Sequence, residues 1–171
     1  MELVYFSEQR IFKNKVKRML REQRKIIHNE LPLARVIHVG ATSIEGLKTK
    51  GDLDVNVRVK KKDFTNSSAI LSVLYKINQP NNWTKTFASF KDDTNLPLPF
   101  GVQLTAIGGN EDNFVLVRDL LRRHKALRLE LNSLKDRYDG KSMVAYRRAK
   151  GLFIERLLKT RRGEFNSPMP Q

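Results

Sequence analysis

The sequence predicts an α/β (α+β) domain in which a small mixed β-sheet is flanked by helices and followed by a helical block. Helical and strand-like hydrophobic spacings alternate up to about residue 112, and the spacing then stays helical over about 112–160. A chain of 171 residues is long enough to bury a core without disulfides or a structural metal. We therefore expect a single domain over 1–163, with 164–171 as a flexible tail.

The elements expected in the first third of the chain follow from their apolar spacing. A helix is predicted over 8–30, with Ser7 as its N-cap. A β-branched run predicts a strand over 34–39, and a turn-rich segment follows it over 40–51. The next strand, 52–59, alternates apolar and polar residues, so one of its faces is apolar and the other polar.

The rest of the chain is predicted to contain one more helix, a long connection, a further strand and the helical block. Proline and asparagine mark the connection, within which a short strand is expected. The helical block is expected to break at two places. The predicted segments are a helix at 64–76, the connection at 77–100 with a strand within 83–90, a strand at 101–107, and helix breaks at 123–124 and 139–140.

Positive charge is concentrated at the two ends of the chain. There are 33 Lys and Arg against 18 Asp and Glu, a formal net charge of +15. Residues 1–35 hold nine bases against four acids, and 118–163 hold fifteen against five. Such a field attracts polyanions, so the expected partners are nucleotides such as nucleoside triphosphates, nucleic acid through the basic helices, or an acidic membrane surface. The alternative is a solvated basic surface with no specific partner.

Composition also excludes several classes of protein. The chain has no cysteine, which rules out disulfide scaffolds, thiolate catalysis and Cys-ligated metal sites. No stretch approaches the ~20 apolar residues of a membrane span. The first twenty residues lack the basic and apolar regions of a secretory signal, so we expect a cytoplasmic protein.

Two acids at the start of the strand 52–59 are the first candidates for chemistry. Alternation places Asp52 and Asp54 on the same polar face, while Leu53 points to the core. Paired carboxylates suit divalent cations that prefer oxygen ligands, so Mg²⁺ or Mn²⁺ is the predicted cofactor. Arg58 shares this face and is expected either to neutralise phosphate or to form a structural ion pair.

The turn before these acids has the composition of a phosphate-binding segment. Gly40 allows the backbone to approach a ligand closely, and Thr42 and Ser43 offer hydroxyl groups. Lys50 is a candidate for neutralising phosphate charge. By itself, without the two acids, the turn is more typical of a helix N-cap and a tight connection.

Three segments in this order resemble the GrpB family. They are HVGATSIEGLKTKGDLDVNVRV, VRDLLRRHKALRLELNSLK and AYRRAKGLFIERLL, within about 36–158. The family is similar to the nucleotidyltransferase superfamily, so the resemblance implies that fold, metal-dependent nucleotidyl transfer, catalytic and metal-binding roles for Asp52 and Asp54, and phosphate-side roles for Gly40, Thr42 and Ser43. The resemblance also matches Arg118, Asp119, Arg122, Tyr146 and Lys150 to the family's C-terminal segments.

The sequence departs from the family pattern in ways that keep a second function open. Ala41 stands where the family usually has Ser, and Glu45 where it often has Pro. Active members of the superfamily often use a third carboxylate from a later strand, and the candidate strand at 101–105 has none. The alternatives are a non-catalytic regulator that binds a nucleotide or nucleic acid on the same fold, and a basic RNA-binding module in which the acids are architectural.

Overall fold

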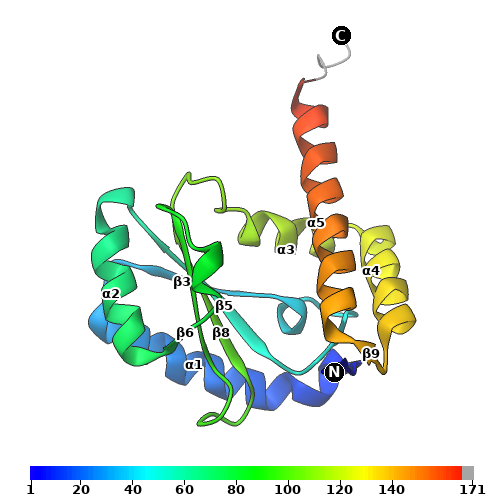
Figure 1. Ribbon diagram of the computed structural model, residues 1–171, viewed down its shortest axis with the longest axis horizontal. Helices are drawn as coiled ribbons and strands as arrows, with labels where there is room; N and C mark the ends of the chain where they lie inside the picture. Colours follow the sequence, from blue (N-terminus) through cyan, green and yellow to red (C-terminus); the bar gives the residue numbers. More distant parts are fainter. Residues whose placement is uncertain (167–171) are drawn as a thin grey trace.

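The core of the molecule is a five-stranded mixed sheet with the strand order β3-β5-β8-β7-β6 (Figure 1). The computed structural model describes the backbone of residues 1–166 and the side chains of residues 1–160. β5 and β8 run parallel to each other, and every other pair of neighbouring strands is antiparallel. The strands are β3 (Arg35–Val39), β5 (Leu53–Val59), β6 (Lys76–Ile77), β7 (Phe87–Asp92) and β8 (Phe100–Ala106).

Helices cover the sheet in two groups that bury separate apolar clusters. α1 (Lys13–Glu30) and α2 (Phe64–Leu74) pack with the apolar side of the sheet in the larger cluster. α3 (Phe114–Arg123), α4 (Lys125–Tyr138) and α5 (Met143–Asn166) enclose the second cluster together with the segment that follows β3. Figure 1 shows α2 on the opposite side of the sheet from α4 and α5.

Short elements join the helical block to the segment that precedes β5. Two small antiparallel pairs, β1 with β9 and β2 with β4, hold the N-terminal segment against α5 and against that connection. The short elements are β1 (Leu3–Val4), β2 (Ser7–Glu8), β4 (Lys48–Thr49), β9 (Lys141–Ser142) and the 3-10 turns Gln9–Phe12, Ala41–Ser43, Lys61–Asp63 and Pro80–Asn82.

The alternation of apolar and polar residues in β5 gives the strand one apolar face and one polar face, as its sequence predicts. Leu53, Val55 and Val57 are fully buried in the cluster with α1 and α2. The polar residues of the strand therefore face the helical block, since successive side chains of a strand point to opposite faces. Asp54 is half-buried there and Asn56 is fully buried, so this face is covered rather than solvated.

The mixed α/β class is confirmed, two local predictions need correction, and the short paired strands were not predicted. Ser7 is not a helix cap: its backbone pairs with Thr49, and α1 begins only at Lys13 after a 3-10 turn. The strand expected within 83–90 lies at 87–92, because a 3-10 turn over Pro80–Asn82 and a bend at residues 85–86 precede it. The sequence did not reveal the paired dipeptide strands, because two residues carry no periodicity.

The C-terminal end bears on the predicted tail. α5 continues to Asn166, three residues into the segment 164–171, and the remainder of that segment lies outside the described residues. Within residues 1–166, no helix has both the length and the apolar character required to cross a bilayer.

Candidate active site

A cleft of about 760 Å³ opens where β5 begins and β3 ends. Four of the predicted site residues line it together, namely Gly40, Lys50, Asp52 and Asp54. Tyr146 and Lys150, which were matched to the family's C-terminal segments, line it as well. The sheet forms one wall, and α4 and α5 form the wall that faces it. The cleft thus brings the acidic pair against helices that lie at least 80 residues later in the chain.

Asp54 lies between two glycines on the neighbouring strands. Gly40 follows β3, and Gly101 is the residue of β8 that is paired with Asp54. A Cβ atom at Gly40 would lie 2.6 Å from Oδ2 of Asp54, and one at Gly101 would collide with Oδ1. Gly40 also has a φ of 73°, which L-residues with side chains rarely adopt. Both glycines therefore make room for this carboxylate.

The Asp54 carboxylate has no compensating donor. Among the side chains of residues 1–160 and their backbone, none donates a hydrogen bond to it or forms an ion pair with it. Burial and the neighbouring charge of Asp52 raise the pKa of Asp54 to about 7. The fold therefore disfavours the negative charge of this carboxylate.

Asp52 lies just before β5 and is paired with a base. Lys50 Nζ is 2.9 Å from Oδ2 of Asp52. Burial by itself would raise the pKa of Asp52, but the charge and the hydrogen bond of Lys50 outweigh it and hold this pKa below its ordinary value. The two carboxylates are therefore inequivalent, with Asp52 ionised and Asp54 close to its titration point at neutral pH.

The helical wall of the cleft is basic. Lys135 of α4 and Arg147 and Lys150 of α5 line it. Lys150 lowers the pKa of both aspartates through its charge. Lys135 is only 2% exposed, and burial together with the charge of Lys150 lowers its pKa to about 7. An anion bound in the cleft would favour the charged form of Lys135.

α4 also holds the segment that carries Lys50. The side-chain oxygen of Asn132 accepts from the backbone N–H of Lys48 at 2.9 Å, and its amide nitrogen donates to the Gly46 carbonyl at 2.8 Å. Lys135 Nζ donates to the carbonyl of Lys48. These bonds from α4 hold the backbone of the segment that leads to Lys50.

The hydroxyls of the turn after Gly40 do not point into the cleft. Ser43 Oγ donates to the Gly40 carbonyl at 2.6 Å, and Thr42 Oγ1 donates to the Asp52 carbonyl at 3.0 Å. Thr42 and Ser43 are buried and are not among the lining residues. Thr42 also contacts His38 Nε2 at 3.0 Å, and burial lowers the pKa of His38 to about 4, so this ring is neutral. The two hydroxyls thus stabilise the turn and the backbone at Asp52.

The arginine-rich segment of α3 is bound to the same turn. Arg118 donates to the carbonyl of His38 at 3.0 Å, and Arg122 donates twice to the carbonyl of Ser43, at 3.0 and 2.6 Å. Arg118 also pairs with Asp119. These side chains position the turn and are not part of the cleft that holds the carboxylates.

The neighbouring strand has no third carboxylate. β8 places Gly101 beside Asp54 and Gln103 beside Asn56. Within residues 1–160, no cluster of three or more His, Asp or Glu side chains could hold a metal ion. The amide of Gln103 lines the cleft where an acid on this strand would lie.

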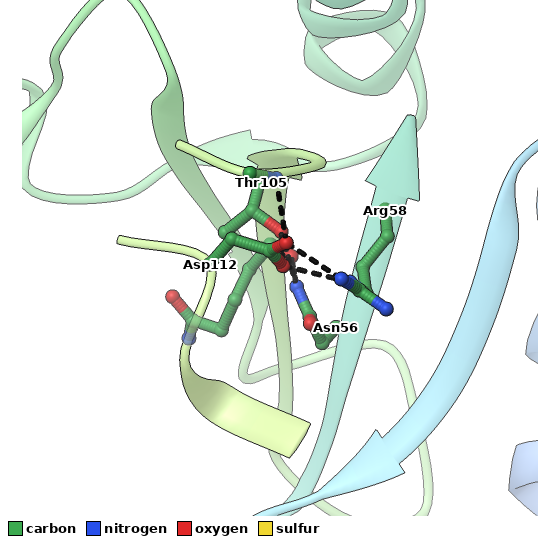
Figure 2. A network of polar contacts seen from close by, with 6 residues as sticks. Asn56, Arg58, Thr105 and Asp112 are labelled. Atoms are coloured by element: carbon green, nitrogen blue, oxygen red, sulfur yellow. Dashed lines mark hydrogen bonds and ion pairs between the residues drawn. The ribbon is translucent and has the colours of Figure 1, made fainter. Parts of the chain in front are cut away.

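The polar face of β5 ends in a structural network (Figure 2). Arg58 binds Asp112 through two parallel bonds of 2.7 and 2.6 Å. Thr105 and the backbone N–H of Gly108 also donate to Asp112. Asn56 donates to Thr105 from the same face. Arg58 is therefore a structural ion-pair partner, which was one of its two expected roles.

Sequence reasoning missed two lining residues that weak signals could have identified. Lys135 follows Leu131 at i+4 and therefore lies on the apolar face of its helix, which is unusual for lysine. Gly101 interrupts a strand pattern, which indicates that another group approaches its backbone. Neither signal reveals that Gly101 lies against Asp54 or that Lys135 lies beside the basic residues of α5, because those contacts are tertiary.

Solved structures identify the class of fold. The crystal structure of GrpB from Enterococcus faecalis aligns with 71% of this chain and 76% of its own, at 16% identity and a TM-score of 0.58. The Cid1 poly(U) polymerase bound to MgGTP aligns with 75% of this chain at 13% identity and a TM-score of 0.56, and this chain spans 42% of that polymerase. The fold is therefore nucleotidyltransferase-like.

Sequence comparison identifies the family. The profile described as GrpB protein matches residues 10–160. UPF0157 protein VC_A0354 from Vibrio cholerae is 35% identical over 128 residues, which cover 75% of this chain and 68% of that protein. This chain belongs to the GrpB family.

Proposed function

We propose that this chain transfers a nucleotidyl group from a nucleoside triphosphate to an acceptor, with Mg²⁺ or Mn²⁺ held by Asp52 and Asp54. One observation carries the proposal: an unpartnered carboxylate, enclosed by two glycines, faces a wall of basic side chains across one cleft. A metal-bound triphosphate requires carboxylates that hold the metal and bases that neutralise the phosphates.

The two aspartates fit a divalent cation. Mg²⁺ usually binds one or two carboxylates together with substrate phosphates, so a third protein carboxylate is not obligatory. The raised pKa of Asp54 has the same implication, because a cation would stabilise the ionised form that the fold disfavours. When bound, the cation would supply Lewis-acid chemistry at the phosphate oxygens.

The chain's own residues have separate tasks in this proposal. Lys135, Arg147 and Lys150 neutralise the triphosphate from the helical wall. Gly40 leaves room for the Asp54 carboxylate beside the turn. Lys50 holds the Asp52 carboxylate in one orientation through their ion pair.

A binding protein without catalysis is the second candidate. The absence of a carboxylate on β8 favours it, since Gly101 and Gln103 occupy the places beside the acidic strand. Such a protein would bind the nucleotide with metal and release no pyrophosphate.

Thermal stability with the four nucleoside triphosphates, with and without Mg²⁺ or Mn²⁺, tests the site. A ligand at about 100 times its Kd adds ~2.7 kcal/mol of stability. We expect a metal-dependent rise in Tm that Asp52→Asn and Asp54→Asn abolish. Glu155→Gln, on the exposed side of α5, is the control and should retain the rise. An equal rise in all four proteins would contradict the assignment.

Release of pyrophosphate distinguishes the two candidate functions. The proposed transferase should form it from the stabilising triphosphate when an acceptor is supplied, and Asp54→Asn should not. Binding without release, with acceptors from water to oligonucleotides, would support the regulator instead.

A further inference from the structure

We propose that the outward face of α1 is a docking surface for the phosphodiester backbone of a nucleic acid strand. We define the α1 basic face as Lys17, Arg18, Arg21 and Lys25, all of which are exposed. This surface lies on the helix rather than in the cleft, so the inference does not depend on the proposed transfer reaction.

The periodicity of α1 gathers these bases on one side. Val16, Met19, Gln23 and Ile27 are its buried residues, and they recur at helical intervals along the face that packs on the sheet. With 3.6 residues per turn, positions 17, 18, 21 and 25 lie on the opposite side. Glu22 is the one exposed acid among positions 13–25, so the face is strongly positive.

The four bases of the α1 basic face differ from the arginines of the helical block that contact the backbone. Within the side chains of residues 1–160, none of the four forms an ion pair or a side-chain hydrogen bond. By contrast, Arg118, Arg122 and Arg128 each donate to main-chain carbonyls. The four charges of the α1 basic face therefore remain available to neutralise phosphates, whereas the guanidinium groups of Arg118 and Arg122 are directed at the main chain.

The spacing of the face suits a phosphate chain. Positions 17 to 25 span about 12 Å of helix, since each residue rises about 1.5 Å. A strand of duplex carries one phosphate per roughly 3.4 Å, so three or four phosphates lie within that length. The four bases are thus as closely spaced as the charges that they would neutralise.

The position of α1 connects this face with the cleft. Phe12, at the N-terminal end of α1, packs so closely on Gly51 that a Cβ atom there would lie 2.6 Å from its ring. Gly51 separates Lys50 from Asp52. Figure 1 shows α1 running from the side of the N-terminus to the side of α2. A strand that follows α1 would therefore have one end near the acidic pair.

An anionic membrane is a poorer partner for this face. Helices that bind in the membrane interface insert apolar side chains. The apolar residues of α1 pack on the sheet instead, and Ile26 is its one large apolar side chain that is exposed, at 41%. A phosphodiester backbone needs only the charges.

Two triple charge-reversal variants with the same net charge test whether nucleic acid binds at the α1 basic face. The test variant is Lys17→Glu/Arg21→Glu/Lys25→Glu. The control is Lys85→Glu/Arg137→Glu/Arg148→Glu, three exposed bases elsewhere on the molecule. None of the three lines the cleft or forms an ion pair with another side chain of residues 1–160. Fluorescence anisotropy measures binding of a labelled single strand of about 20 nucleotides, as RNA and as DNA, from about 50 to 200 mM salt without nucleotide.

We expect the test variant to lose at least about tenfold in affinity and the control about twofold or less. The slope of log K against log salt should fall by about 2, from three lost contacts at ~0.7 each. Preference for RNA or DNA identifies the natural strand, and either result supports the surface. If circular dichroism shows that the test variant is unfolded, Lys17→Gln/Arg21→Gln/Lys25→Gln replaces it.

Three results would overturn the proposal. Equal losses in the test and control variants would show that net charge alone attracts the strand. If the wild-type protein bound neither strand at the lowest salt concentration, the α1 basic face would not be a docking surface for nucleic acid. Binding to phosphatidylserine vesicles that is lost in the test variant, without binding to either strand, would assign the face to a membrane.

Discussion

Two carboxylates beside the same strand have opposite environments. Asp112 accepts hydrogen bonds from Arg58, Thr105 and Gly108, and its side chain is 5% exposed. Asp54, at the other end of the polar face of β5, has no donor among the described side chains and faces a cleft. Burial opposes ionisation at both, yet the pKa of Asp112 is lowered and that of Asp54 is raised to about 7.

The comparison separates a structural acid from an acid available for ligands. When protein donors occupy the acceptor sites of a carboxylate, they stabilise the fold, and no acceptor site remains for a substrate or metal. A buried carboxylate without donors costs stability, and such groups are concentrated at functional sites. The contrast therefore supports the assignment of Asp54 without reference to the family.

The largest effect is expected when the structural acid is removed. Asp112→Ala should lower the free energy of unfolding by about 3 kcal/mol, because Arg58 would lose its buried partner. The pKa of Asp112 is lowered, so its contribution is present above about pH 4 and is lost as the pH falls through the lowered value. Urea unfolding at pH 7 and pH 3 measures both. The exposed Asp93→Ala should change stability by less than about 0.5 kcal/mol.

Removal of the cleft acid should have the opposite sign. In metal-free buffer at pH 8, Asp54→Asn should raise the free energy of unfolding by about 2 kcal/mol, because the folded state disfavours the charge. The raised pKa means that the native state binds more protons than the unfolded state between about pH 4 and 7. The advantage of the variant should therefore shrink as the pH falls through this range, and a loss of stability at pH 8 would refute this account of the site.

An intermediate effect is expected from Gly101→Ala. The added methyl would collide with the Asp54 carboxylate, so we expect a loss of about 1 to 3 kcal/mol. The variant should also lose the rise in Tm caused by Mg²⁺ and nucleotide. Gly151→Ala in α5 is the matched control: apart from its chain neighbours and the adjacent backbone of its own helix, no atom of the described residues lies within 4 Å of the added methyl. The variant should gain up to about 1 kcal/mol in helix stability.

The smallest effect should come from Arg58→Lys. Lysine keeps the charge but cannot form the two parallel bonds to Asp112, so we expect a loss of about 1 kcal/mol in urea unfolding. The nucleotide-dependent rise in Tm should stay unchanged, since Arg58 does not line the cleft. If that rise were lost, the structural and functional ends of β5 could not be separated.

Local pattern predicted much of the site. The alternation of β5 placed Asp52 and Asp54 on one face, and the resemblance of three segments led to the family that comparison confirms. The same reasoning could not decide the roles of Thr42 and Ser43. A hydroxyl in a turn can face a ligand or close the turn itself, and only the positions of the Gly40 and Asp52 carbonyls decide between the two.

The sequence by itself determined the mixed fold and the acidic pair, because both follow from residue spacing along one element. Tertiary structure alone decided the environment of that pair. Gly101 comes from a strand paired through non-local contacts, and Lys135 and Lys150 come from helices at least 80 residues away. The burial and charge that raise the pKa of Asp54 depend on distances in space, and the order of residues along the chain does not specify those distances.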